Sequence, residues 1–292
     1  MNKRQLLSKI RKEFPKLTWK TAQHNVEGWD HYIIILDDKY VFRFPRTKDY
    51  LKRLRYEILL LDYLKDKVDI PIPNYTFIAK DKSFAGYNMI KGDQLKKKIF
   101  KKLPVSTTNK ISKQIAVFLT KLHKTSLDIA RKYDVHSEDK QKSYKELVRD
   151  IKKYIYPTVS KKRQLLIEDF LNDLKDLKFS IRVFTHRDFY PHHILIKKNK
   201  KSIAGVIDFG DVKIDDPAID FAELWVYGRK FVEQIYDYYK GPKDRKFLKR
   251  SILYYKRVPL GLLISRLQSK SGSIKLAHNM FKDIYLSKNA FK

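Results

Sequence analysis

Histidine and aspartate recur in short motifs within one segment of the chain. His186-Arg187-Asp188 is followed by His193, and Asp208-Phe209-Gly210 lies further along. Phosphoryl transfer needs a base that orients the acceptor hydroxyl for in-line attack. It also needs a metal ion that oxygen or nitrogen ligands hold near the triphosphate. Asp188 is therefore the candidate base, and Asp208 is the candidate metal ligand.

Each motif taken alone could be a chance match. An isolated His-Arg-Asp is common, and Asp-Phe-Gly by itself could be a turn. Their order is much less expected by chance, because the two aspartates lie about twenty residues apart and kinase-type motif sets are defined by that order. We therefore favour the chemical interpretation of the segment.

Apolar runs with the length of strands adjoin these polar groups. They cover residues 182–185, 193–196 and 203–207, and the tip between the last two is Lys197-Lys-Asn-Lys-Lys201. Short apolar runs bounded by turn residues are typical of strands. The sequence thus predicts rigid strands whose ends place the polar side chains in the adjoining loops.

The rest of the chain divides into a β-rich part and a helical part. Asp37-Asp38 separates the runs Tyr32–Leu36 and Lys39–Phe44, which predicts a hairpin with a tight turn. Further strands are expected at 75–78 and 86–90, and helical spacing covers 4–14, 49–65, 111–123, 143–156, 160–177 and much of the chain after Ile219. We predict an α+β fold. Its small N-terminal lobe, residues 1–90, holds an antiparallel sheet with one internal helix, and its larger, mainly helical C-terminal lobe covers residues 91–292. A hinge is expected at about residues 87–92.

The composition excludes several classes of protein. Hydrophobic residues make up 43% of the 292, which is ample for a packed core and argues against disorder. The absence of cysteine excludes disulfides, thiolate catalysis and cysteine-ligated metals. The N-terminus has no apolar signal core, and no apolar run reaches membrane-spanning length. We expect a cytoplasmic protein with no membrane contact, and we expect a monomer.

The charge of the chain is unusual. Sixty-four Lys and Arg against 33 Asp and Glu leave a net charge of +31, which attracts polyanions. A nucleic-acid partner must therefore be weighed. The lysines are spread along the whole chain, however, and no nucleic-acid-binding motif is present. We favour a lysine-rich solvated surface over a nucleic-acid site.

The segment from Phe184 to Leu224 resembles the aminoglycoside phosphotransferase superfamily, whose fold is protein-kinase-like. The resemblance extends weakly over most of the chain. It is closest to the 2''-aminoglycoside phosphotransferases, because His193 stands five residues after Asp188, where asparagine is usual. The resemblance implies that Asp188 is the catalytic base and that His193 and Asp208 bind Mg²⁺. It also implies that Asp220, in Asp-Pro-Ala-Ile-Asp, supports the catalytic loop, and that His186 is structural.

The same resemblance assigns nucleotide-binding residues to the N-terminal lobe. Val41-Phe-Arg-Phe-Pro45 is similar to the family strand whose lysine contacts phosphate, although position 43 is Arg43 here, and a guanidinium binds phosphate in a different geometry. Glu57 is its expected partner, with an exposed helix charge as the alternative. Gly28, in Val26-Glu-Gly-Trp-Asp-His31, is the candidate for a phosphate loop, although a plain β-turn would explain this glycine equally well. Backbone groups of Asn88 and Ile90 are expected to contact a purine, which leaves ATP and GTP both open.

The acceptor is a hydroxyl compound that the sequence narrows only in part. Asp208 to Glu223 is locally acidic, which would attract a cationic aminoglycoside, and Glu223, Glu233 and Asp237 are candidates to meet its amines. The net charge of +31 opposes such a substrate, so a macrolide or a sugar-like metabolite remains an alternative acceptor. An inactive kinase-like protein that binds polyanions is the alternative from another class. The complete Asp188, His193 and Asp208 set favours the kinase.

Overall fold

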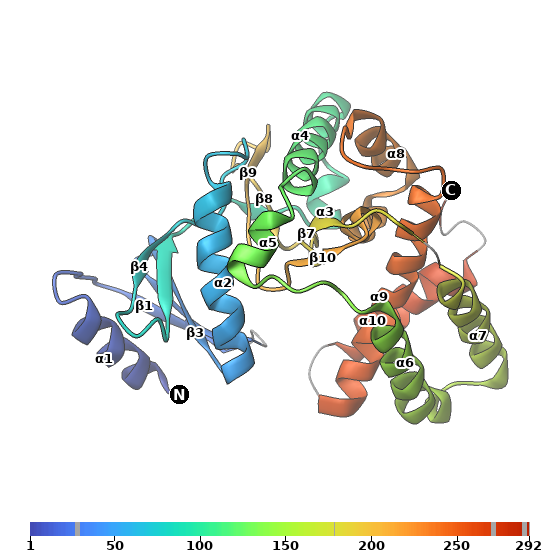
Figure 1. Cartoon of the computed structure of the whole chain (residues 1–292), viewed down its shortest axis with the longest axis horizontal. Coiled ribbons are helices and arrows are strands. Elements are labelled where there is room, and N and C mark those ends of the chain that lie inside the picture. Colours follow the sequence, from blue (N-terminus) through green and yellow to red (C-terminus); the bar gives the residue numbers. More distant parts are fainter. Residues whose placement is uncertain (27–29, 178, 270–272, 288–290, 292) are drawn as a thin grey trace.

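Two lobes make up the chain in a computed structural model that describes residues 1–26, 30–177, 179–269, 273–287 and 291 (Figure 1). The N-terminal lobe contains α1 (Lys3–Glu13), β1 (Ala22–Asn25), β2 (His31–Leu36), β3 (Tyr40–Pro45), α2 (Lys48–Leu64), β4 (Tyr75–Ile78) and β5 (Ala85–Asn88). Its strands form one antiparallel sheet in the order β1-β2-β3-β5-β4. The predicted internal helix is α2, and α1 precedes the first strand.

The predicted hairpin joins β2 to β3. Its turn residues, Asp37 and Asp38, have φ values of 50° and 48°, as two-residue hairpin turns of the primed type require. The Asp37 carboxylate accepts backbone N–H groups of Lys20 at 3.0 Å and Thr21 at 2.6 Å. These bonds stabilise an aspartate at a turn position where glycine is common.

The two faces of β2 serve different purposes, because successive side chains of a strand point to opposite faces. Ile34 and Leu36 are fully buried in a cluster that includes Leu6 and Ile10 of α1. His31, Ile33 and Ile35 alternate with them and line a cleft on the other side of the sheet. In Figure 1 that side carries α2, which stands between the sheet and the C-terminal lobe.

The C-terminal lobe is mainly helical with two small sheets. Its helices include α3 (Lys97–Phe100), α4 (Val105–His123), α5 (Asp128–Tyr133), α6 (Lys140–Asp150), α7 (Lys161–Lys175), α8 (Arg229–Tyr238), α9 (Phe247–Ser269) and α10 (Ile274–Phe281). The π-helical segments are η1 (Ile151–Ile155) and η5 (Lys282–Leu286), and the 3-10 helices are η2 (Tyr156–Thr158), η3 (Pro217–Phe221) and η4 (Glu223–Tyr227). The predicted helix at 143–156 therefore ends early as an α-helix, at Asp150, and continues as η1.

The small sheets carry the polar motifs. β6 (Asp93–Gln94) pairs with β8 (Ile194–Ile196), which pairs with β9 (Ile203–Val206). β7 (Val183–Thr185) pairs with β10 (Lys213–Asp215). The proposed hinge at about 87–92 includes the last two residues of β5, a strand of the N-terminal sheet, and ends just before β6, a strand of the C-terminal lobe.

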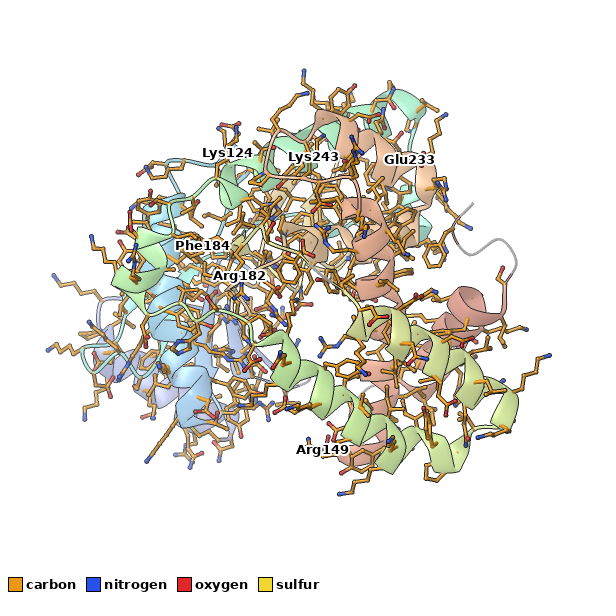
Figure 2. All side chains as sticks on the ribbon, turned by 45° about the vertical axis from the view of Figure 1, so that its right-hand side comes forward. Lys124, Arg149, Arg182, Phe184, Glu233 and Lys243 are labelled. Carbon is orange, nitrogen blue, oxygen red and sulfur yellow. The ribbon has the colours of Figure 1, made fainter. Side chains whose placement is uncertain are left out.

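Basic side chains are spread over the surface of the molecule. Lys124, Arg149, Arg182 and Lys243 lie on separate parts of the C-terminal lobe in Figure 2. Within the part of the chain that the structure describes, no helix is both long and apolar enough to cross a bilayer.

Candidate active site

A cleft of 720 Å³ lies between the N-terminal sheet and the small sheets of the C-terminal lobe. Its N-terminal wall includes Ile33, Ile35 and Val41, and its C-terminal wall includes Leu195 and Ile207. Two apolar walls of this kind suit a flat aromatic ring such as a purine. Polar side chains also line this cleft. They belong to residues that come after strands in the sequence, and they lie at one end of the cleft.

The backbone between the lobes forms one edge of this cleft. Met89 donates its N–H to the Lys39 carbonyl at 2.7 Å, which extends the pairing of β3 with β5. Backbone groups alternate in direction along a strand, so those of Asn88, the last residue of β5, point away from β3. Ile90 itself lines the cleft. The contact of Asn88 and Ile90 with a purine stays a prediction.

Asp220 is buried, and its side chain supports the backbone of the loop that follows β7. Its carboxylate accepts backbone N–H groups of His186 at 2.8 Å and Arg187 at 2.7 Å, and the His123 ring lies 2.9 Å away. Arg187 has a φ of 65°, which an L-residue adopts only at some cost. The bonds to Asp220 therefore hold a strained loop in place.

His186 and Arg187 anchor the loop in different ways. His186 is fully buried, and its Nε2 lies 3.1 Å from the Ile207 carbonyl. Burial lowers the pKa of His186, which keeps the ring neutral. Arg187 pairs with Asp215 and Glu138, each at 2.8 Å. Both side chains thus face the protein interior, and the next residue, Asp188, is left 42% exposed in the cleft.

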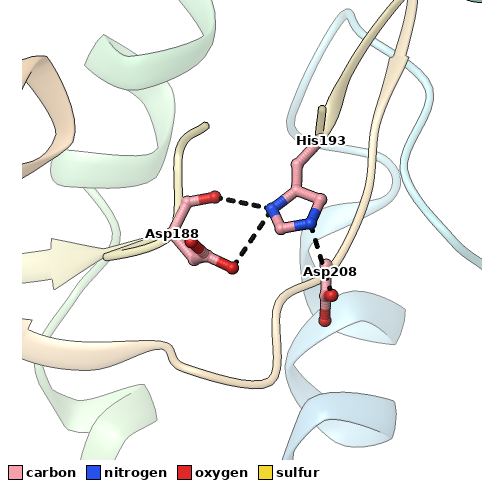
Figure 3. A group of neighbouring side chains, drawn as sticks. All are labelled: Asp188, His193 and Asp208. Atoms are coloured by element: carbon pink, nitrogen blue, oxygen red, sulfur yellow. Dashed lines mark hydrogen bonds and ion pairs between the residues drawn. The ribbon is translucent and has the colours of Figure 1, made fainter. Parts of the chain in front are cut away.

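Asp188, His193 and Asp208 all line this polar part of the cleft and lie close together. Figure 3 shows the His193 ring between the two aspartates. His193 Nδ1 lies 2.9 Å from the Asp188 carbonyl oxygen and 3.2 Å from its Oδ2. Nδ1 therefore donates, and in the neutral ring Nε2 keeps its lone pair. Nε2 faces Asp208 Oδ2 at 3.6 Å.

The three residues fit a metal ion. One ligand atom from each residue lies within 4.8 Å of the others. The free lone pair on His193 and the carboxylate of Asp208 converge on one point, and such nitrogen and oxygen donors bind divalent cations.

The site is strongly polarised. Burial lowers the pKa of His193, but its hydrogen bonds to Asp188 and the charge of Asp208 outweigh burial and raise it to about 9. Burial raises the pKa of Asp208, but the Arg43 cation and the His193 ring outweigh it and hold the value at about 2. Without a metal ion, a proton on His193 supplies positive charge between the two carboxylates. A bound cation would supply that positive charge in place of the proton.

Arg43 and Glu57 form a buried ion pair of 2.6 Å, with Glu57 completely inaccessible to solvent. Tyr75 bonds both partners at 3.1 Å. Arg43 also donates to Asp208 at 3.0 Å, a contact that joins residues 165 positions apart and crosses between the lobes. Burial raises the pKa of Glu57 to about 7, and the Arg43 cation limits that rise.

A family model described as "Phosphotransferase enzyme family" matches residues 21–248 of this chain. That range contains both the Arg43–Glu57 pair and the Asp188, His193 and Asp208 group. The chain belongs to the phosphotransferase enzyme family. The relative "Uncharacterized protein YcbJ" of Bacillus subtilis (strain 168) is 24% identical over 270 residues, which cover 85% of this chain and 86% of that protein.

Solved phosphotransferase structures share the fold. The GDP complex of wild-type aminoglycoside 2'-phosphotransferase-IIIa aligns with a TM-score of 0.87 and 22% identity, over 98% of this chain and 99% of that chain. Macrolide 2'-phosphotransferase type I aligns with a TM-score of 0.72 and 20% identity, over 98% and 97% of the two chains. The predicted kinase-like fold and the predicted superfamily are confirmed.

Three residues were predicted to meet the amines of the acceptor molecule, and the fold places them in different surroundings. Glu223 begins η4 near Asp188, and burial raises its pKa to about 8, with a smaller contribution from the Asp188 charge. Its Oε2 is buried without a hydrogen-bond partner in the described part of the chain. Glu233 pairs with Arg229 at 3.0 Å on the outer surface of α8 (Figure 2), and Asp237 is exposed on the same helix. Of these three residues, the structure brings Glu223 toward Asp188.

Gly28 lies outside the described residues, so its place in a phosphate loop stays a prediction. The sequence interpretation missed two groups in this phosphotransferase. His31 lies 3.3 Å from Arg43, and its alternation with Ile33 and Ile35 is the signal that could have placed it in the cleft.

The second missed group lies on α2 and contacts the loop after Asp208. Arg53 pairs with Asp211 at 2.5 Å, and the Tyr56 hydroxyl donates to the Gly210 carbonyl at 2.9 Å. Arg53 precedes Glu57 by four residues, and Tyr56 precedes it by one. The spacing between Arg53 and Glu57 places them on one side of the helix and could have indicated this contact.

Proposed function

We propose that this phosphotransferase moves the γ-phosphate of ATP or GTP to a hydroxyl group of an aminoglycoside. The convergence of Asp188, His193 and Asp208 within 4.8 Å, at the polar end of an apolar-walled cleft, carries the proposal. A nucleotide base fits between the apolar walls, which directs its phosphates toward the polar end. The N-terminal lobe, residues 1–90, acts as the nucleotide-binding lobe in this proposal.

Asp188 orients the acceptor. Its carboxylate is 42% exposed, so a substrate hydroxyl can donate to it and turn its oxygen toward the γ-phosphate. His193 holds the Asp188 carboxylate through Nδ1, and Asp220 holds the backbone beneath it. The acceptor proton passes to the Asp188 carboxylate as the new O–P bond forms, while the bond from the γ-phosphorus to the β,γ-bridging oxygen breaks and ADP or GDP leaves.

His193 and Asp208 are the residues that would hold Mg²⁺, through Nε2 and a carboxylate oxygen. When bound, the ion would offset the charge of the triphosphate and fix its orientation. Arg43 remains held by Glu57 and Tyr75, so it supplies a fixed positive charge beside Asp208. These groups stabilise charge that develops during transfer without having to move.

The acceptor class rests on two supports. Similar structures are described as complexes with kanamycin, streptomycin and gentamicin. Glu223 offers an unpaired carboxyl oxygen near Asp188, and a cationic acceptor amine beside it would favour the ionised form of this carboxyl. A macrolide is the second candidate, because macrolide phosphotransferases share the fold and the net charge of +31 repels polycations.

A transfer assay with γ-labelled ATP and GTP over a panel of aminoglycosides, macrolides and sugars tests the proposal. Asp188→Asn should lower transfer by about 100-fold to 10,000-fold, the usual contribution of a positioned base. Asp62→Asn, which alters an exposed aspartate of α2, should leave it unchanged. Equal transfer by wild type and Asp188→Asn would contradict the proposal. Tight nucleic-acid binding without transfer to any acceptor would favour the inactive polyanion-binding protein.

A further inference from the structure

The terminal N–H groups of Arg43 already have protein partners. Nη1 donates to Glu57 at 2.6 Å and to Tyr75 at 3.1 Å. Nη2 donates to Asp208 at 3.0 Å and faces His31 Nδ1 at 3.3 Å. Each terminal nitrogen of a guanidinium carries two hydrogens, so four partners match four N–H groups. Arg43 can bond a phosphate oxygen through these nitrogens only by giving up one of those partners.

Arg43 also determines which ring nitrogen of His31 carries the hydrogen. A guanidinium in a protein can only donate, so Nδ1 of His31 must accept. The hydrogen of the neutral ring then lies on Nε2. Burial, together with the nearby Arg43 charge, lowers the pKa of His31 to about 3, so the ring stays neutral at physiological pH.

The Nε2–H group of His31 has no hydrogen-bond partner in the described part of the chain. The residue is only 3% exposed, and a buried donor without an acceptor destabilises the protein. His31 lines the nucleotide cleft on the same face of β2 as Ile33 and Ile35. An unused donor at a ligand cleft indicates that the ligand supplies the acceptor.

The surroundings of this donor favour an anion. Arg43, Arg46 and Arg53 all lie near enough to His31 to disfavour a positive charge on its ring, and Asp208 opposes them in part. The same positive field attracts phosphate. The chain also has no glycine-rich sequence of the kind whose backbone covers phosphates in other nucleotide-binding proteins.

We propose that His31 is a phosphate-binding residue, whose Nε2–H donates to an oxygen of the nucleotide triphosphate. Arg43 orients the ring through Nδ1, and His31 in turn reaches the phosphate that Arg43 cannot bond without releasing a protein partner. This role rests on the proposed function, because it requires a nucleoside triphosphate in the cleft.

Calorimetric titration with MgATP, MgGTP, adenosine and guanosine tests the proposal. His31→Phe keeps a ring but removes the donor, and His31→Gln keeps an N–H near the position of Nε2. His31→Phe should weaken triphosphate binding by about 10-fold or more, the range for a hydrogen bond to a charged group, and leave nucleoside binding unchanged. His31→Gln should recover most of the lost affinity. His24→Phe is the matched control, because Nε2 of His24 in β1 also lacks a partner among the described residues.

Nitrogen-15 NMR of the unaltered protein supplies a second measurement. It should show the hydrogen of His31 on Nε2, and that signal should shift with MgATP but not with adenosine. The role is overturned if the hydrogen lies on Nδ1, if His31→Phe binds triphosphates as wild type does, or if it loses nucleoside and triphosphate binding equally. Failure of the wild type to bind any triphosphate is a distinct result, which would overturn the proposed function and this role together.

Discussion

Arg43 collects partners from distant parts of the chain. Glu57 comes from α2, Tyr75 from β4 and Asp208 from the loop after β9. A buried charge is stable only when other groups match it closely, so these contacts decide the position of the guanidinium. The alternative of an exposed Glu57 is excluded, because that side chain is fully buried.

Glu138 provides a residue-scale prediction about pH. Burial raises the pKa of this carboxyl, but Arg187 at 2.8 Å and Lys213 at 2.7 Å outweigh it and lower the value to about 2. A carboxyl with a lowered folded-state pKa stabilises the fold above its unfolded-state pKa of 4.5, and this contribution is lost as the pH falls toward 2. Glu138→Gln should therefore lower the free energy of unfolding by about 3 kcal/mol near neutral pH.

Urea unfolding between pH 6 and pH 2.5 checks this expectation. The difference in unfolding free energy between wild type and Glu138→Gln should shrink as the pH falls below 4.5. Glu146→Gln, on the exposed face of α6, should change stability by less than about 0.5 kcal/mol. A difference for Glu138→Gln that stays constant over the whole range would show that its ion pairs do not supply the stabilisation.

At the scale of elements, β9 supports the connection between the lobes. A Cβ atom added to Gly205 would lie 2.6 Å from Cγ2 of Ile90 and 2.8 Å from the carbonyl oxygen of Pro71. The strand can approach the proposed hinge this closely only because residue 205 has no side chain. The nucleotide cleft therefore depends on a residue in a strand that carries no polar site group.

Gly205→Ala should disturb the hinge and the cleft together. The added methyl group should cost about 1–3 kcal/mol of stability, as overpacking usually does. Because Ile90 must move, the KM for nucleotide should rise as well. The control is Gly261→Ala in α9, where the added Cβ meets no atom within 4 Å, and it should raise stability by about 1 kcal/mol.

Thermal unfolding and nucleotide kinetics of the two glycine variants give the comparison. An unchanged nucleotide KM in a destabilised Gly205→Ala protein would show that Ile90 does not position the nucleotide.

The long periodic elements were predictable because many residues contribute to each pattern. The strands β1, β6 and β10 were missed because they contain only four, two and three residues.

At the scale of the whole molecule, the net charge of +31 surrounds a cleft that contains several acids. Basic side chains extend from many parts of the surface (Figure 2), whereas the described lining of the cleft includes Arg43 but no lysine. Their long-range field attracts nucleotides and repels polycations. Salt screens this field, whereas contacts inside the cleft are screened much less.

Salt should therefore affect the two substrates in opposite directions. Between 25 and 200 mM KCl, on the order of a 10-fold change is expected, with kcat/KM rising for a polycationic aminoglycoside and falling for MgATP or MgGTP. Steady-state kinetics at each salt concentration measure both effects, and a neutral acceptor provides the control. A fall in kcat/KM for the aminoglycoside would show that the acids in the cleft dominate even at long range.

The sequence by itself predicted the α+β fold with a β-rich N-terminal part and a helical C-terminal part, and it pointed to the segment that holds the candidate catalytic residues. Helix and hairpin patterns depend on residues close together in the sequence. The order of Asp188, His193 and Asp208 along the chain can be read without knowing how the chain packs. Only the tertiary structure decided which charges meet. The contact of Arg43 with Asp208, the ring orientation of His31 and the separation of Glu223 from Glu233 all depend on how the lobes and helices pack. Side chains distant in sequence meet only when packing brings them together. Their spacing along the chain does not predict how far apart they lie in the folded protein.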